Sequence, residues 1–323
     1  EVTEYITDGD HQPAPKSDSG VLFVKIKDIQ DNRLTFDNAL FVPQEYYNRL
    51  PKNRKAEYGD TLYTVVGSYG IPAFVNHNIP FCFERNIALL HPNNRVIPKY
   101  LYYAVNNPIF YGNANNIANG SAQKLIPLSK LAGMEISVPP IERQETIVNI
   151  LSAYDDLIEN NQKQIKLLEE AAQRLYKEWF IDLRFPGHEN VKIVDGVPEG
   201  WERMVLSEVT SILKRGISPK YSDNGKYSVI NQKCIRSSIM DISESRRQEK
   251  EYVPTLNLQD SDTVICSTGT GTLGRVGRVY GDYPNTTFDS HVTLVRAKEN
   301  PNYIYHVVKS QQEYLICICW LLN

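Results

Sequence analysis

The sequence predicts an α+β protein in which two repeated strand-rich modules are joined by a long heptad-patterned helix. Three observations lead to this fold class. Short β-branched and aromatic segments fill both halves of the chain, similar strings recur at a nearly constant offset, and one central stretch changes to helical periodicity. With 323 residues, the chain has room for two domains of ordinary size.

The two halves of the chain resemble each other at three collinear places. The paired strings are E-V-T-E-Y-I-T-D-G from Glu1 with E-V-T-S-I-L-K-R-G from Glu208, G-D-T-L-Y-T-V-V-G-S-Y-G from Gly59 with S-D-T-V-I-C-S-T-G-T-G-T-L-G from Ser261, and I-P-K-Y-L-Y-Y-A-V (97–105) with N-P-N-Y-I-Y-H-V-V (300–308). Their offsets of 207, 202 and 203 residues differ only as loop insertions would make them. Collinear matches at nearly one period predict two copies of one module.

Each module is expected to be a loop-rich sheet with a short helix. The strand-like segments are rich in β-branched and aromatic residues and are bounded by Gly, Pro, Asn and Asp; they include 21–26, 61–66, 264–267 and 291–295. A brief helical pattern at 99–105 recurs at 302–308. We assign residues 1–140 to the first module and residues 188–323 to a linker and an incomplete second module.

Residues 141–187 are predicted to form a spacer built on one long helix. Pro140 can begin it, because the first turn of a helix needs no amide donor. Apolar residues with heptad spacing form a seam along it: Leu151, Tyr154, Ile158, Ile165, Leu168, Leu175 and Trp179. Asn161 alone interrupts this seam, and a buried Asn of this kind often fixes register. We expect a partner helix along the seam; packing on the chain's own modules is the alternative.

The composition favours a globular protein without a membrane span. The chain is 41% hydrophobic and 23% charged, as in globular proteins, and no run of 18 apolar residues is present, so no membrane span is expected. Five cysteines without a C-x-x-C pair favour a reducing, cytoplasmic location. The net charge of −3 does not indicate nucleic-acid binding, so such a function must rest on other features.

The string G-T-G-T-L-G at residues 269–274 formally matches the dinucleotide motif G-x-G-x-x-G. The residues after it are β-like instead of helical, and Arg275 and Val276 stand where a Walker A motif needs Lys and Ser or Thr. We therefore expect either a tight glycine turn that brings threonine hydroxyls near DNA or a plain hairpin turn. The chain also lacks N-P-P-Y, D-P-P-Y, H-E-x-x-H and zinc-spaced cysteines, so no catalytic residue, metal or cofactor is predicted on it.

Four further strings are shared with one known family. They are I-P-L-S-K-L-A-G-M-E-I-S-V-P-P-I-E-R-Q-E-T-I (126–147), L-Y-K-E-W-F-I-D-L-R-F-P-G-H-E (175–189), G-V-P-E-G-W-E (196–202) and D-T-V-I-C-S-T-G-T-G-T-L-G (262–274). Together with the two-module layout, they make the chain resemble the specificity subunit of type I restriction-modification systems. The likeness covers essentially the whole chain except its last few residues. Compared with the family's layout, the first module is slightly truncated at its start and the second module is truncated at its end.

The resemblance implies that each module is a target-recognition domain that reads one half of a split, asymmetric site in double-stranded DNA. It implies an antiparallel coiled coil that spaces the modules and docks DNA-methylating subunits. Chemistry would then belong to partners: two methyltransferase subunits with S-adenosylmethionine, and a restriction and translocase subunit with ATP and magnesium. This chain itself would be no enzyme.

Candidate DNA contacts are basic and polar residues beside aromatics or in glycine-rich loops. Arg and Lys bind phosphates, and Asn, Gln, Arg and Lys can read base edges in the major groove. The candidates are Arg49, Lys52, Arg54, Lys55, Ser68, Tyr69, Asn113, Asn115, Asn116, Gln123, Lys124, Arg246, Arg247, Thr268, Thr270, Thr272 and Arg275. We expect the stretch 113–124 to be a polar loop; for each residue singly, a solvated surface position is an equal alternative.

Two other functions stay open. One is the recognition portion of a fused restriction-methylation enzyme, which the lack of catalytic motifs and the two-repeat layout disfavour. The other is a scaffold protein that does not bind DNA. A scaffold predicts no salt-sensitive DNA binding, whereas a DNA-reading subunit predicts an affinity that falls steeply with salt.

Overall fold

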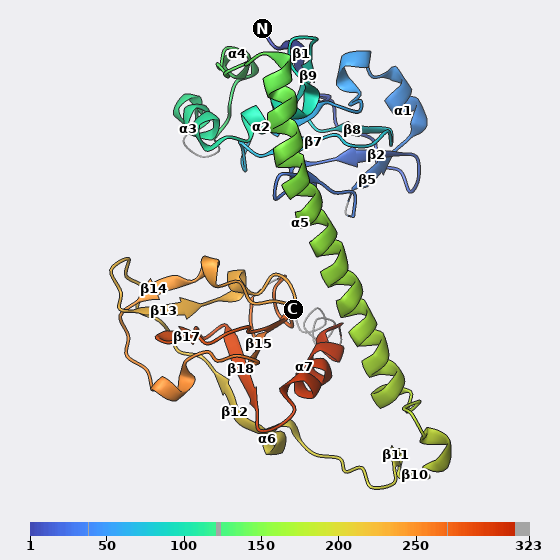
Figure 1. Cartoon of the computed structure of the whole chain (residues 1–323), viewed down its shortest axis with the longest axis vertical. Helices are drawn as coiled ribbons and strands as arrows, with labels where there is room; N and C mark the ends of the chain where they lie inside the picture. The colour runs from blue at the N-terminus through green and yellow to red at the C-terminus, as the bar shows by residue number, and fades with distance from the viewer. Residues whose placement is uncertain (38, 121–123, 270, 314–323) are drawn as a thin grey trace. The chain divides into compact units, whose positions relative to one another are not determined.

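The computed structural model describes residues 1–37, 39–120, 124–269 and 271–313 of the chain (Figure 1). Two compact units are present, one of residues Glu1–Gln162 and one that begins at Lys163. Each unit has hydrophobic clusters of its own, around Tyr63 and Leu62 in the first and around Phe288 and Val295 in the second.

The first unit contains two main sheets. The larger has the strand order β1-β9-β6-β7 and the smaller the order β5-β2-β8. Their bounds are β1 Thr3–Asp8, β2 Val21–Val24, β5 Leu40–Val42, β6 Thr61–Thr64, β7 Pro72–Phe74, β8 Phe81–Phe83 and β9 Ile87–Pro92, with a small hairpin of β3 Ile29–Gln30 and β4 Arg33–Leu34. The helices are α1 Gln44–Arg49, α2 Pro98–Val105, α3 Pro108–Ile117, α4 Leu128–Ala132 and the start of α5 Ile141–Tyr176.

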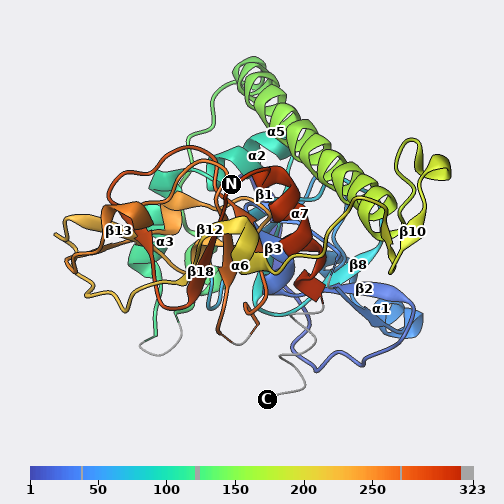
Figure 2. The same ribbon diagram turned by 90° about the horizontal axis from the view of Figure 1, so that it is seen from below.

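The second unit contains a sheet of order β12-β18-β15-β16 and a sheet of order β14-β13-β17. The bounds are β12 Thr210–Arg215, β13 Tyr227–Ile230, β14 Arg246–Gln248, β15 Thr263–Cys266, β16 Val276–Arg278, β17 Thr286–Phe288 and β18 Val292–Ala297. The helices α6 Leu206–Val209 and α7 Pro301–Ser310 contact the β12-β18-β15-β16 sheet (Figure 2). A hairpin of β10 Ile193–Val194 and β11 Val197–Pro198 precedes both sheets in the chain.

The two units repeat one strand topology, which confirms the predicted repeat of strand-rich modules. Each larger sheet pairs its first strand with its last, and that ladder is irregular at the same place, between Thr3 and Tyr5 and between Thr210 and Ile212. Each smaller sheet contains one parallel pair, β2 with β8 and β13 with β17. The brief helices predicted near 99–105 and 302–308 are α2 and α7.

The glycine that ends the first repeated string has the same task in both modules. A Cβ built on Gly9 would lie 2.0 Å from the carbonyl oxygen of Phe83, and one on Gly216 would lie 2.2 Å from that of Phe288. Only glycine lets these two backbone segments approach so closely. The shared glycine therefore follows from the sheet geometry.

The aspartate shared by the second pair of strings is also explained by the fold. Asp60 and Asp262 are buried, and each accepts a hydrogen bond from the backbone amide three residues earlier, at 2.7 and 2.8 Å. Each also meets a base on the neighbouring strand: Asp60 Oδ1 lies 2.6 Å from His91 Nδ1, and Asp262 Oδ2 lies 2.7 Å from Arg296 Nη2. A buried carboxylate needs such partners, because removing its charge from water costs free energy that hydrogen bonds and ion pairs must offset.

Helix α5 is joined to the first module by one buried glutamine. The side chain of Gln144 is fully buried, and its Oε1 accepts a hydrogen bond of 2.8 Å from the backbone amide of Ile97. Its Nε2 donates to the carbonyl oxygens of Arg95 (3.2 Å) and Pro139 (2.8 Å). Gln144 thus links the turn before α2, the end of the module and the first turn of α5, which runs on as one continuous helix (Figures 1 and 2).

A second contact holds the next turns of α5 against α2. Tyr103 Oη on α2 donates a 2.5 Å hydrogen bond to Asp155 and lies 3.3 Å from Ser152 Oγ. Ile147 and Val148 pack on the module's core from the same helix. The first half of α5 therefore has one face committed to its own module.

The predicted seam of α5 is largely exposed to solvent. Exposure ranges from 38% for Leu151 to 70% for Leu168, and Tyr154, Ile158, Ile165 and Leu175 lie between these values. Trp179 is half-buried and lies beyond the α-helical register, because residues Lys177–Ile181 of the predicted spacer form a π turn in place of a continued α-helix. Heptad spacing does not reveal such a turn, because a π turn inserts one residue into the helix without changing the local composition.

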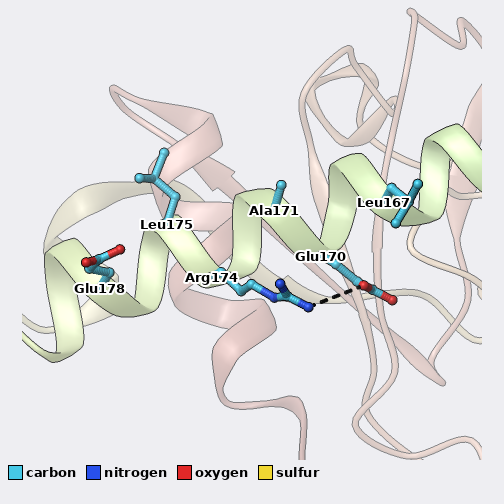
Figure 3. A pocket seen from close by; sticks show the side chains of 6 residues that line it. All are labelled: Leu167, Glu170, Ala171, Arg174, Leu175 and Glu178. Carbon is cyan, nitrogen blue, oxygen red and sulfur yellow. Dashed lines mark ion pairs between the residues drawn. The ribbon is translucent and has the colours of Figure 1, made fainter.

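Figure 3 shows the last turns of this helix in the second unit. Leu167, Ala171 and Leu175 follow one another at intervals of four residues and line a shallow groove with Glu178. Beside them, Arg174 Nη2 lies 3.8 Å from Glu170 Oε2. An apolar stripe bordered by charges is typical of a helix that packs against another helix.

Aromatic residues gather where α5 ends. Tyr176 and Phe180 contact Tyr303 of α7, with ring centroids 6.1 and 4.8 Å apart, and Tyr176 also stacks on His306 at 5.9 Å. Trp201 lies 5.8 Å from Phe180, so it joins the same cluster from the linker. The family-like strings L-Y-K-E-W-F and G-W-E are thus brought together as a hydrophobic anchor.

We predict that Gln144→Ala lowers the free energy of unfolding by about 2–4 kcal/mol, because it removes three hydrogen bonds and the packing of a fully buried side chain. Gln164→Ala, on an exposed turn of the same helix, is the matched control and should change stability by less than about 0.5 kcal/mol. Denaturant unfolding of both variants measures this. Equal stabilities for the two variants would contradict the anchoring role.

A second prediction concerns pH. Burial lowers the pKa of His306, and Arg278 adds to the effect, so the folded state binds this proton less readily than the unfolded chain. The second unit should therefore lose stability as the pH drops below the ordinary histidine value of about 6.5. His306→Tyr introduces the residue found at the equivalent position 103 of the first module. It should make the free energy of unfolding depend less on pH between pH 7 and 5. His11→Gln, an exposed histidine, is the control; an unchanged slope in His306→Tyr refutes the assignment.

Candidate nucleic-acid interface

Charge is distributed unevenly along the first module. Residues 85–134 contain no Asp or Glu, although the chain as a whole has a net charge of −3. The same stretch contains five bases: Arg85, Arg95, Lys99, Lys124 and Lys130. This signal is readable in the sequence, but the whole-chain net charge conceals it. It marks the chain segment that carries α2, α3 and α4 as one suited to a polyanion.

Helix α3 occupies the place where the sequence indicated a polar loop, so that expectation was wrong for Asn113, Asn115 and Asn116. Pro108 stands in the first turn, and the side chain of Asn107 caps it by accepting a 2.8 Å hydrogen bond from the amide of Ile109. Phe110 and Ala114 are buried, and the Phe110 ring packs edge-on against Tyr63 at 5.8 Å. This burial outweighs the low helix propensity of Asn and Gly.

Three predicted DNA contacts meet beside α3. Tyr69 Oη donates a hydrogen bond to Asn115 Oδ1, and Lys124 Nζ lies 3.1 Å from that same oxygen and 3.4 Å from Tyr69 Oη. The ring of Tyr111 is nearly parallel to that of Tyr69, with centroids 6.3 Å apart. We call Tyr69, Tyr111, Asn115 and Lys124 the amide–tyrosine cluster. Tyr111 was not among the predicted residues, and Gln123 lies outside the described residues.

The β6–β7 loop is tied to this cluster. The amide of Gly67 donates a 3.0 Å hydrogen bond to the carbonyl oxygen of Lys124, and Val66 forms a bridge with Leu125. Gly70 has a φ of +87°, and a Cβ there would lie 2.5 Å from the ring of Tyr111. Glycine is therefore required at this point, and Ser68 is left exposed at the tip of the loop.

The basic residues around α1 differ in how free their charges are. Arg54 lies 3.6 Å from Asp8 and 3.4 Å from Asp10, so its charge is balanced within the module. Lys52, 3.8 Å from Glu57, is highly exposed. The ammonium group of Lys55 lies 4.9 Å over the Tyr47 ring, and Arg49 is exposed at the end of α1. The structure thus leaves the charges of Lys52, Lys55 and Arg49 near solvent and places that of Arg54 inside an ion-pair network.

In the second module, the glycine-rich string connects β15 to β16. A strand follows it where a dinucleotide site needs a helix. The amide of Gly274 donates a 2.8 Å hydrogen bond to the carbonyl oxygen of Cys266. In the β6–β7 loop, the amide of Gly70 donates a 2.9 Å hydrogen bond to the carbonyl oxygen of Thr64, so the β15–β16 and β6–β7 loops are equivalent. Much of the loop's polar chemistry is used internally: Thr272 Oγ1 lies 3.2 Å from the Gly269 carbonyl oxygen, and Arg275 donates to that of Gly271 at 2.9 Å.

Other predicted contacts in this module remain on the surface. Thr268 Oγ1 is hydrogen-bonded to His291 Nδ1; Thr268 is half-buried and His291 is exposed. The guanidinium of Arg246 lies 3.5 Å over the Tyr221 ring, and Arg247 donates a 3.3 Å hydrogen bond to Ser228. Thr270 lies outside the described residues.

A buried aspartate lies behind these residues. Asp289 accepts a 2.8 Å hydrogen bond from the amide of His291, and burial raises the pKa of its carboxyl group. Across the residues that the structure covers, no three His, Cys, Asp or Glu side chains are grouped so as to hold a metal ion. Among those same residues, none of the helices has the length and apolar character needed to cross a membrane.

Comparison with known proteins gives one consistent result. The model of the type I restriction modification DNA specificity domain matches residues 20–170 and 198–319. The type I restriction enzyme MjaIX specificity subunit of Methanocaldococcus jannaschii is 33% identical over 172 residues, which are 49% of this chain and 40% of that protein. The putative type I restriction enzyme MjaX specificity subunit of the same organism is 28% identical over 244 residues, 70% of this chain and 55% of that protein.

A solved structure shows the same fold. The S subunit of a type I restriction-modification system from M. genitalium superposes with a TM-score of 0.51 at 16% identity, covering 96% of this chain and 75% of that one. The chain spans about half the length of the curated relatives it matches.

We predict that Gly70→Ala destabilises the first module by about 1–3 kcal/mol, because the new methyl group meets Tyr111 in addition to the strain of a positive φ. Gly271→Ala is the matched control: its φ is +77°, yet a Cβ there has nothing within 4 Å among the described residues. Thermal unfolding of the two variants separates the clash from the backbone strain. Equal losses would show that Tyr111 gives way freely.

Proposed function

The chain belongs to the type I restriction modification DNA specificity family, and we propose that it is the non-catalytic subunit that gives a type I restriction-modification complex its DNA sequence specificity. Residues 1–140 and 188–323 carry the two reading modules, and residues 141–187 form the spacer between them. Each module reads one half of a split DNA site. The halves differ, because the two modules present different residues at equivalent loops.

The observation that carries this proposal is the acid-free stretch 85–134, which contains three of the four residues of the amide–tyrosine cluster. DNA repels carboxylates and attracts ammonium groups, so a surface without acids is suited to close approach. Lys124 supplies a charge beside exposed amides, which are the groups that read base edges.

The proposed contacts divide by their surroundings. Arg49, Lys52, Lys55, Lys124, Arg246 and Arg247 are proposed to bind phosphates, and Ser68, Asn113, Asn116 and Thr268 to face the groove. Tyr69 and Asn115 are bonded to each other and hold α3 in place beside them. Gln123 and Thr270, which lie outside the described residues, are proposed as groove contacts from the sequence alone. Arg54, Thr272 and Arg275 already bond within their own modules and hold the loops in shape. For Arg54 the reason is that a charge neutralised by two carboxylates has less to offer a phosphate.

The exposed seam of α5 supports a docking role for the spacer. Six of its seven apolar residues are at least 38% exposed, which is unusual for large apolar side chains at heptad spacing. A partner helix and two methyltransferase subunits are the proposed occupants. S-adenosylmethionine, ATP and magnesium are then bound by the methyltransferase and translocase subunits in the cytoplasm, and this chain contributes recognition.

Adenine methylation sequencing tests the function directly. The chain is co-expressed with its neighbouring methyltransferase subunit, and modified bases are mapped in host DNA. A split, asymmetric motif that disappears when this chain is omitted is the expected result. Absence of a motif from a complex that nevertheless co-purifies would show docking without reading.

Salt dependence separates this function from that of a scaffold. We predict that duplex affinity falls steeply with salt and that Lys124→Gln reduces the slope of log K against log salt by about 1, since one phosphate contact is lost. Lys192→Gln, an exposed lysine of the linker, is the control and should leave the slope unchanged. Binding that does not respond to salt would favour a scaffold.

A further inference from the structure

The residues of α3 divide among three faces. Phe110 and Ala114 are buried in the module, while Tyr111 and Asn115 turn toward Tyr69 and Lys124. The third face points to solvent and consists of four residues at helical spacing i, i+3, i+4 and i+7: Ile109, Gly112, Asn113 and Asn116. Ile109 is 74% exposed. We call these four residues the outward face of α3.

Gly112 is not explained by packing within the chain. It lies in the middle of a helix, where glycine is less stable than alanine. In the described part of the chain, a Cβ on Gly112 would meet nothing within 4 Å apart from its two chain neighbours and the backbone of its own helix. At Gly9 and Gly70, by contrast, a Cβ would collide with a neighbour. The missing side chain at Gly112 therefore leaves room for something outside the chain.

The chemistry of the outward face identifies that occupant. Its two amides each offer a donor and an acceptor, the pair of groups that recognises adenine, and Ile109 offers an apolar surface of the kind that contacts a thymine methyl group. The face has no charge of its own, and the stretch 85–134 around it has five bases and no acid. A polyanion is complementary to such surroundings, and the major groove of B-DNA is wide enough to admit an α-helix.

Asn115 differs from the other two asparagines of this helix. Its Oδ1 accepts hydrogen bonds from Tyr69 and Lys124, so that oxygen is occupied. The side-chain contacts of Asn115 lie within the amide–tyrosine cluster, which fixes the rotation of α3 against the β6–β7 loop. Asn115 is thus a positioning residue.

We propose that the outward face of α3 is the base-reading surface of the first module, and that Gly112 allows this helix to approach the base edges of the major groove. The inference rests on the proposed function and deepens it. It assigns base reading to Asn113 and Asn116, close approach to Gly112, and positioning to Asn115. The amide–tyrosine cluster, which includes Lys124, holds the helix at the groove.

Selection of duplex DNA with randomised bases tests the assignment. The full chain is co-purified with the methyltransferase subunit, and base preferences are determined separately for each half of the selected site. Gly112→Ala and the double variant Asn113→Ala/Asn116→Ala are compared with Asn94→Ala, an exposed amide of the same acid-free stretch that is not on α3. The half read by the second module is an internal control in every selection.

Gly112→Ala should raise the melting temperature by about 2 °C, because alanine favours the helix. At the same time, it should reduce discrimination about tenfold at one or more base pairs of one half-site, and the double variant should do the same. The other half-site and the Asn94→Ala variant should be unaffected. A variant that is more stable yet reads less well excludes misfolding as the cause.

Two results would overturn the inference while leaving the proposed function intact. One is a wild-type split motif that both α3 variants reproduce with full discrimination. The other is unchanged discrimination together with weaker co-purification of the methyltransferase, which would make the outward face a protein contact. If the wild-type chain selects no motif and shows no salt-sensitive binding, the proposed function fails and the inference fails with it.

Discussion

The buried side chain of Gln144 is the contact on which the arrangement of the first unit depends. This side chain is fully buried, and its three hydrogen bonds pair it with one backbone amide and two carbonyl groups, so the first turn of α5 has one orientation relative to the module. Because a helix is rigid over many turns, fixing its first turn also determines which residues of the first half of α5 face away from the module. The exposed positions of Leu151, Tyr154 and Ile158 follow from that single orientation.

The internal repeat shows which positions the fold itself requires. Gly9 and Gly216 are needed because two backbones meet there, and Asp60 and Asp262 are needed because each caps a loop from inside the sheet. The base opposite the aspartate is interchangeable, since a histidine serves in one module and an arginine in the other. Residues that face outward in equivalent loops share no such requirement, and that freedom is what two modules with different DNA targets would need.

The sequence was informative wherever the signal was local or repeated. Heptad spacing and the paired strings predicted the long helix and the duplicated modules, because periodicity and self-similarity need no knowledge of contacts. Helix α3 was missed, since its Asn and Gly residues disfavour a helix and only the burial of Phe110 against Tyr63 stabilises one. Likewise, Asp8 and Asp10 neutralise Arg54 from more than forty residues away, and no local pattern reveals that pairing.

The modest charge of the chain bears on how its proposed reading surface would work. Affinity from counterion release grows with the number of phosphates neutralised, and five bases along residues 85–134 give only a moderate contribution. Specificity depends instead on the difference between right and wrong base pairs, to which exposed amides contribute and ammonium groups bound to phosphates do not. A surface rich in amides and poor in charge is therefore better at discriminating than at holding DNA. In the proposed complex, the other phosphate contacts of this chain and the subunits docked along α5 would supply the remaining affinity, which would link recognition by this chain to assembly on its exposed seam.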